Sequence, residues 1–126
     1  MSERLKVGVV GAGVIAQVMH LNYLRELSDR FEIVALCDIS SENAANNADR
    51  YSIAKRYTDW QEMLTDADID AVFILTSGSH APIAIAAANA GKHILVEKPM
   101  CFSVAEGLLV TGTDDRQPVG KVIVAG

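Results

Sequence analysis

A glycine-rich turn near the start of the chain contains the first residues whose spacing suggests chemistry. The segment Gly11-Ala12-Gly13-Val14-Ile15-Ala16 directly follows an apolar run and opens a helical pattern. Gly11 permits a tight turn, Gly13 places no side chain between the backbone and a ligand, and Ala16 lets the next helix pack closely on a sheet. The first N–H groups of that helix, at its positive dipole end, favour a pyrophosphate. We therefore expect a dinucleotide to be contacted by Gly11, Gly13, Val14 and Ile15.

The carboxylate of Asp38 is the second candidate group. Asp38 ends the apolar run 31–37 and stands twenty-two residues beyond Ala16. An acid at the tip of the second strand of a dinucleotide-binding unit accepts hydrogen bonds from the adenosine ribose hydroxyls, and it repels the extra phosphate of NADP. The spacing therefore predicts NAD as the cofactor in preference to NADP. The alternative is an aspartate that only caps a helix or shapes a turn.

Composition favours one globular domain over residues 1–126. Half of the 126 residues are hydrophobic, which is enough for one core of ordinary size. The formal net charge is -5, and the eleven Lys and Arg residues are scattered, so we expect no nucleic-acid surface. No apolar run is long enough to span a bilayer, and the first four residues lead directly into a strand, so we expect the cytoplasm and no membrane contact. Cys37 and Cys101 suggest neither a disulfide framework nor a metal site.

Strand-like and helix-like segments alternate along the chain, which is the pattern of a parallel sheet covered on both faces. Strands are predicted over 5–10, 31–37, 71–75, 93–96 and 122–125, with a short one near 54–57. Helices are predicted over 14–27, from Ser40 or Ser41 to 51, and over 59–66, 82–90 and 103–110. Right-handed crossovers give an α/β, doubly wound parallel sheet, the Rossmann fold, with its ligand at the carboxyl ends of the strands.

Some side chains are expected to serve the core and not the ligand. In the first helix, one buried stripe is predicted to contain Ile15, Val18, Met19, Leu21, Leu24 and Leu27. Trp60 and Met63 are interpreted as core residues of the third helix. His20 is interpreted as a residue of a helix face and His93 as a residue of a strand.

Two further segments fall at the carboxyl ends of predicted strands: Thr76-Ser77-Gly78-Ser79-His80 and Glu97-Lys98-Pro99. Together with the glycine turn and Asp38, they resemble the oxidoreductase family of glucose-fructose oxidoreductase and inositol dehydrogenase (Gfo/Idh/MocA). The similarity covers essentially the whole chain. It implies an NAD-dependent enzyme that transfers hydride between nicotinamide and a hydroxyl or carbonyl carbon of a sugar or polyol.

The resemblance also implies roles for individual side chains. Lys98 would be the catalytic residue beside the nicotinamide, contacting the reacting hydroxyl or carbonyl, with Glu97 in the same pocket. Thr76, Ser77 and His80 would contact the ribose and nicotinamide half of the cofactor, although this chain has Thr-Ser-Gly where the family often has Thr-Pro-Asn. The alternatives are a surface lysine fixed by a proline turn at Lys98, and a helix cap at His80.

Members of the family continue into a larger α/β domain that binds the substrate and builds the oligomer. We therefore expect this chain to be the cofactor half and to bind NAD without turnover. The apolar surface that the second domain would cover could also join copies of the chain into a homo-oligomer. A rival of another class is a non-catalytic NAD-sensing or partner-binding module. A methyltransferase is a second rival, but the 97–99 and Thr76 segments have no place in it.

Overall fold

The fold is built on one parallel sheet. The computed structural model describes residues 4–13, 15–76, 80–97 and 122–125. Within these ranges six strands pair in the order β3-β2-β1-β4-β5-β6, and every neighbouring pair is parallel. The strands are β1 (Leu5–Val10), β2 (Phe31–Cys37), β3 (Lys55–Tyr57), β4 (Ala71–Ile74), β5 (His93–Glu97) and β6 (Val122–Ala125). From β1 the chain adds β2 and β3 on one side, and then returns to add β4, β5 and β6 on the other side. This order confirms the predicted doubly wound α/β fold.

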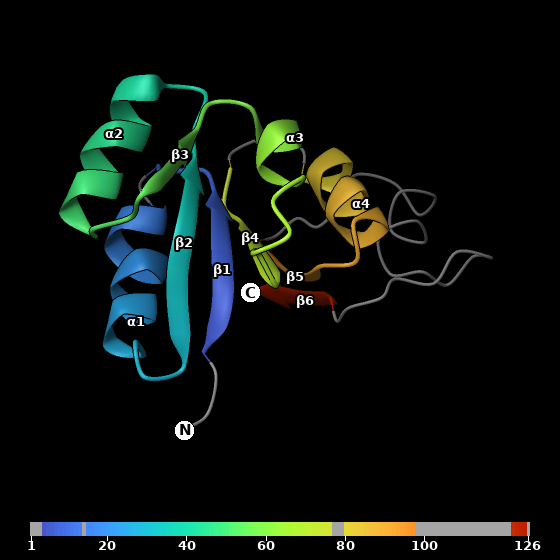
Figure 1. The fold of residues 1–126 in the computed structure, drawn as a ribbon, viewed down its shortest axis with the longest axis horizontal. Helices are drawn as coiled ribbons and strands as arrows, with labels where there is room; N and C mark the ends of the chain where they lie inside the picture. Colours follow the sequence, from blue (N-terminus) through green and yellow to red (C-terminus); the bar gives the residue numbers. More distant parts are fainter. Residues whose placement is uncertain (1–3, 14, 77–79, 98–121, 126) are drawn as a thin grey trace.

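The helices cover both faces of this sheet. Figure 1 shows α1 and α2 on one side and α3 and α4 on the other. The helical segments are the π-helix η1 (Ala16–His20), α1 (Leu21–Glu26), α2 (Ser41–Arg50), α3 (Trp60–Met63) and α4 (Ala81–Asn89). The helix expected over 103–110 lies outside the described residues.

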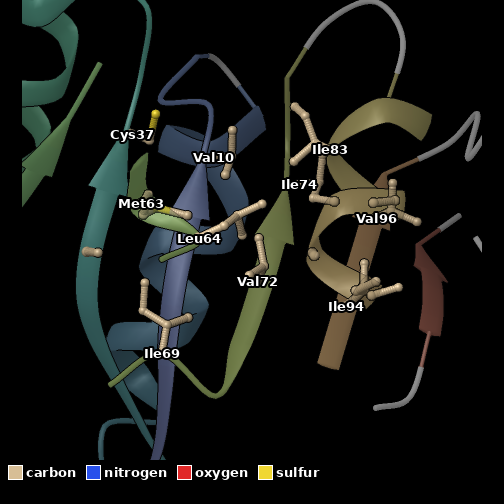
Figure 2. Packing of buried hydrophobic residues seen from close by; sticks show 14 of the residues in the cluster. Val10, Cys37, Met63, Leu64, Ile69, Val72, Ile74, Ile83, Ile94 and Val96 are labelled. Atoms are coloured by element: carbon tan, nitrogen blue, oxygen red, sulfur yellow. The ribbon is translucent and has the colours of Figure 1, made fainter. Parts of the chain in front are cut away.

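Alternation along the strands divides the core into two layers. In β5, Ile94 and Val96 belong to the cluster under α3 and α4, whereas Leu95 packs against the cluster under α1 and α2. Successive side chains of a strand point to opposite faces, so a sheet covered on both sides needs nearly continuous apolar strands. Figure 2 shows the first cluster, with Met63 and Leu64 contributed by the α3 segment.

The first helix differs from the predicted one because it begins with a π-turn. The N–H of Leu21 donates to the carbonyl of Ala16, five residues earlier, and these two residues are both fully buried. A π-turn adds one residue to a helical turn, so the side chains within this turn do not follow the 3.6-residue stripe that the sequence suggested. The prediction that Met19 is buried is therefore wrong, and this side chain is 38% exposed. Leu24 is buried as predicted, but α1 ends before Leu27, which lies at the C-cap and is 44% exposed, contrary to the prediction.

The other helix boundaries follow from their caps. The Oγ atom of Ser40 accepts a hydrogen bond from the N–H of Asn43 at 3.2 Å, which confirms the predicted start of α2. The side chain of Asp59 caps α3 in the same way, although α3 ends at Met63, earlier than predicted. At α4, Pro82 lies in the first turn and Gly91 follows the last turn with a φ of +77°, as predicted.

A buried lysine fastens the connection between α3 and β4. Lys92 is 6% exposed, and its Nζ atom donates to the carbonyls of Asp66 and Ile69 at 3.0 and 2.8 Å. On the outer side of the same connection, the Lys55 ammonium donates to the Asp66 carboxylate and lowers the pKa of that carboxyl. These hydrogen bonds fix the conformation of the segment that connects α3 to β4.

No helix among the described residues is both long and apolar enough to cross a membrane.

Met63→Ala tests the layer between α3 and the sheet. Met63 is fully buried, and its Cε atom lies 3.2 Å from the place where a Cβ on Gly8 would stand, so truncation of this side chain leaves a cavity against the backbone of β1. We expect the free energy of unfolding to fall by about 2–5 kcal/mol in urea titrations. Glu62→Ala, at an exposed neighbouring position, should change it by less than about 0.5 kcal/mol. Equal effects of the two substitutions would contradict this account of the core.

Candidate nucleotide-binding site

A cleft opens at the carboxyl ends of the strands. Its volume is about 830 Å³, within the usual range for sites of small molecules and cofactors. It lies where the order of strands reverses, between the segment that follows β1 and the segment that follows β4. The site residues predicted from the sequence that line this cleft are Gly11, Gly13, Ile15, Asp38, Thr76, His80 and Glu97.

The two glycines of the turn have different reasons to be glycine. Gly11 has a φ of +101°, and a Cβ added to it would lie 2.8 Å from the backbone nitrogen of Thr76. Only a residue without a side chain fits there, because both the conformation and the neighbouring strand exclude one. At Gly13 an added Cβ would meet nothing within 4 Å, so the backbone of this residue borders open space in the cleft.

Asp38 connects two segments that surround the cleft. Its Oδ2 atom accepts a hydrogen bond from the N–H of Ala12, and its Oδ1 atom accepts one from the N–H of Ser40, each at 2.8 Å. The aspartate therefore does shape a turn, which was the alternative to a ligand contact. Each carboxylate oxygen has a further lone pair, so the half-buried side chain retains the capacity to accept two more hydrogen bonds.

Cys37 also lines the cleft, but its thiol is unreactive. Its side chain is free of any disulfide and 2% exposed. Burial, followed by the negative charge of Asp38, raises the pKa of the thiol to about 12. Because the thiolate is the nucleophilic form, Cys37 stays protonated near neutral pH and contributes packing.

Thr76 and His80 close the cleft on the β4 side. The Oγ1 atom of Thr76 is buried and has no hydrogen-bond partner among the described residues. The Nε2 atom of His80 contacts the carbonyl oxygen of Thr76, and since a carbonyl only accepts, this nitrogen carries the proton. His80 occupies the N-cap position of α4, but its side chain makes no cap bond, so capping by the imidazole is not observed.

Glu97 lines the cleft at the end of β5, and its carboxylate is paired with His20. The sequence placed His20 on a helix face, without this partner. Only the folded chain brings them together, because 77 positions separate the two residues.

Other lining residues were not among the predicted contacts. Ile39, which directly follows Asp38, is 92% exposed although it is apolar. Trp60 packs on the core, as expected, but it also lines the cleft. An exposed apolar residue immediately after the strand-end acid was the available signal for Ile39; nothing local distinguishes Trp60 from an ordinary core tryptophan.

Three predicted site residues, Val14, Ser77 and Lys98, lie outside the described residues. Across the parts of the chain that the structure describes, no group of three or more His, Cys, Asp or Glu side chains could hold a metal ion.

Comparison with known proteins identifies the family. Residues 5–119 match the family model for Gfo/Idh/MocA, described as an oxidoreductase family with an NAD-binding Rossmann fold. The chain belongs to the Gfo/Idh/MocA family. The resemblance drawn from the glycine turn, Asp38 and the 97–99 segment is thereby confirmed, as is the prediction of an NAD-binding Rossmann domain. Membership of this family favours an enzyme over a non-catalytic module.

Relatives within Gfo/Idh/MocA include an inositol 2-dehydrogenase of Salmonella typhimurium, 39% identical over 104 residues, which are 81% of this chain and 31% of that protein. A 4-carboxy-2-hydroxymuconate-6-semialdehyde dehydrogenase of Sphingobium is 36% identical over 97% of this chain and 38% of that protein. The WlbA dehydrogenase of Bordetella pertussis, solved with NADH and UDP-GlcNAcA, superposes with a TM-score of 0.87 at 27% identity, over 98% of this chain and 37% of that one. The chain thus spans about a third of the length of these relatives.

The pair Gly11→Ala and Gly13→Ala separates the two roles of the turn in the free protein. We expect Gly11→Ala to lower the free energy of unfolding by at least about 2 kcal/mol, because a positive φ and a contact with the Thr76 backbone both oppose its methyl group. Gly13→Ala should change it by less than about 0.5 kcal/mol, since the added methyl enters open space. Thermal and urea unfolding measure both; a stable Gly11→Ala variant would refute the steric argument.

Proposed function

We propose that residues 1–126 form the dinucleotide-binding domain of an NAD-dependent oxidoreductase that transfers hydride between nicotinamide and a hydroxyl or carbonyl carbon of a sugar or polyol. The observation that carries this proposal is the cleft at the point where the strand order reverses, with the open backbone of Gly13 and the carboxylate of Asp38 on its walls. Membership of the Gfo/Idh/MocA family supports the same reaction class.

The described residues fit a dinucleotide chemically. The N–H of Gln17 already donates to the carbonyl of Gly13 at 3.0 Å. Ala16, the first residue of η1, has no side-chain cap at Ile15, so its N–H remains suited to an anion beside Gly13. Ile39 offers an exposed apolar surface next to Asp38, which suits an adenine base. The buried Oγ1 atom of Thr76 lacks a partner among the described residues and suits a hydroxyl or amide of the ligand.

Asp38 would hold the adenosine ribose with the lone pairs that its two backbone hydrogen bonds leave over. The same negative charge would disfavour a ribose that carries a phosphate, because the two like charges would stand a few ångströms apart. This is the basis for proposing NAD and not NADP.

Lys98 is the proposed catalytic residue. Bound NAD would supply the hydride acceptor or donor, while the ammonium of Lys98 would stabilise developing negative charge on the substrate oxygen or pass on its proton. Glu97 would line the same pocket, and Val14 and Ser77 would add backbone contacts to the cofactor. A sugar or polyol as substrate is supported by relatives named for inositol and by a neighbour solved with UDP-GlcNAcA.

We also propose the cytoplasm as the compartment and self-association as the assembly state. Support for self-association comes from apolar side chains that stand exposed on η1 and α1, including Met19 at 38% and Tyr23 at 55%. These two residues are four positions apart and so share one side of a regular helix, although the π-turn places them only approximately in line.

The ratio of NADPH to NADH dissociation constants tests the role of Asp38. We expect the unmodified chain to bind NADH at least about tenfold more tightly, and Asp38→Ala to bring the ratio close to one, because the variant removes the repelling charge. A ratio is needed because Asp38→Ala also releases Ala12 and Ser40 and would weaken both cofactors. As a control, Gly13→Val should weaken both equally, its side chain entering the open space. Calorimetry that finds NADPH bound as tightly as NADH by the unmodified chain would refute the assignment.

Lys98→Met tests catalysis in a protein that joins this chain to a substrate-binding domain. We expect kcat to fall by at least about a hundredfold, the usual effect of losing a positioned acid or base, with NADH affinity unchanged. Lys55→Met, which removes a lysine on β3 that pairs with Asp66 away from the cleft, should leave kcat unchanged. Turnover that survives in the Lys98 variant would exclude it from the reaction.

A further inference from the structure

An imidazole reaches across the sheet to the last residue of β5. The Nε2 atom of His20 lies 2.5 Å from Oε1 of Glu97, and the two side chains are only 11% and 17% exposed. A carboxylate oxygen accepts, so the Nε2–H group of His20 donates a hydrogen bond to Oε1 of Glu97. The contact is a short hydrogen bond with a charged acceptor, largely shielded from water.

The position of His20 is itself fixed. Its ring meets the ring of Phe73 edge to face, with centroids 6.1 Å apart and planes at 86°. Its helix is pinned by the π-turn between Ala16 and Leu21, both fully buried against the sheet. His20 therefore presents its Nε2 atom to Glu97 from a rigid platform and not from a mobile surface.

Glu97 stands at one end of the cleft with its backbone already ordered. It is the last residue of β5 and pairs with Ala125 of β6, while its neighbour Val96 pairs with Ile74 of β4. Strand pairing fixes the backbone of Glu97 and leaves only its side chain free to rotate. The hydrogen bond from His20 restricts that rotation. The second oxygen of the carboxylate retains lone pairs for a hydroxyl or amide N–H of a ligand.

The two carboxylates of the cleft lie at opposite ends of it. Asp38 directly follows β2 and Glu97 ends β5, with β1 and β4 between them, which separates the two strand ends by about 14 Å at the usual strand spacing. With Asp38 at the adenosine end, Glu97 occupies the end where the nicotinamide half would lie. Glu97 also immediately precedes Lys98 in the sequence.

The geometry points to His20 as a positioning residue for the nicotinamide half of the site: it holds the Glu97 carboxylate in place to accept a hydrogen bond from the nicotinamide riboside. This inference rests on the proposed function, since it assumes a dinucleotide in the cleft. Without the imidazole, this enclosed carboxylate loses its donor and is no longer held in one orientation toward the cleft. The ordered acceptor is thereby lost.

Calorimetric titration of the 126-residue chain with NADH and with ADP tests the inference, because ADP lacks the nicotinamide riboside. We expect His20→Ala to weaken NADH binding roughly 10- to 100-fold, the effect of losing one hydrogen bond to a charged group, and to change ADP binding less than about twofold. His20→Gln, whose amide can donate to Glu97, should recover part of the NADH affinity. The double variant His20→Ala/Glu97→Ala should bind NADH as tightly as the single variant with the lower NADH affinity, because both substitutions remove the same contact. His93→Ala, at the opposite end of β5, is the control and should change neither affinity.

Equal loss of NADH and ADP affinity in His20→Ala would overturn the inference, since it would mean that the pair only braces the fold. Unchanged NADH affinity in a folded His20→Ala variant would overturn it as well, while leaving the proposed function intact. Glu97→Ala keeps the test decisive if His20→Ala does not fold, because removal of the carboxylate must produce the same selective loss. Failure of the unmodified chain to bind NADH would overturn the proposed function, and this inference with it.

Discussion

The close approach of the glycine turn to the strand end at Thr76 is the constraint on which the cleft depends. Parallel pairing of β1 with β4 brings the two carboxyl ends to the same edge of the sheet, and the N–H of Leu75 donates to the carbonyl of Val10 at 2.8 Å. The chain leaving β1 must therefore turn at once, in contact with the backbone of Thr76, and only glycine fits at position 11. After the turn, Gly13 lines the cleft, and the first helix packs on the face of the sheet that contains Phe73 and Leu95.

Much of the fold could be predicted because its determinants are local. Apart from Lys6 and Glu32 near their starts, the runs 5–10 and 31–37 are apolar on both faces, and that is the requirement for an inner strand of a covered parallel sheet. Helix starts at Ser40 and Asp59 depend on one side-chain oxygen and the N–H groups beside it, so the sequence contains the whole interaction. The first helix was mispredicted at Met19 because it contains a π-turn, whereas a 3.6-residue period assumes that every turn is regular. It was mispredicted at Leu27 because α1 ends one residue before it.

The candidate site divides in the same way. Gly11, Gly13 and Asp38 follow from a motif whose spacing reflects a single β-turn-α unit and the next strand, and the structure places all three on the cleft. Glu97, from the family segment at 97–99, lines the cleft. Its partner His20 could not be foreseen, since the contact exists only when β5 pairs with β4, two strands away from β1. Trp60 was missed as a cleft residue for the same reason: it packs against the core as predicted, and only the assembled sheet shows that it also lines the cleft.

The double attachment of Asp38 has a consequence for how this site could evolve. The carboxylate that would choose between cofactors also accepts the hydrogen bonds of Ala12 and Ser40, so one side chain carries both selectivity and architecture. A lineage that came under selection to use the phosphorylated cofactor could not exchange this residue alone, because the turn and the start of α2 would lose their acceptors together. Another residue would first have to supply an acceptor for these two N–H groups. Cofactor preference would therefore change slowly during the evolution of such a domain.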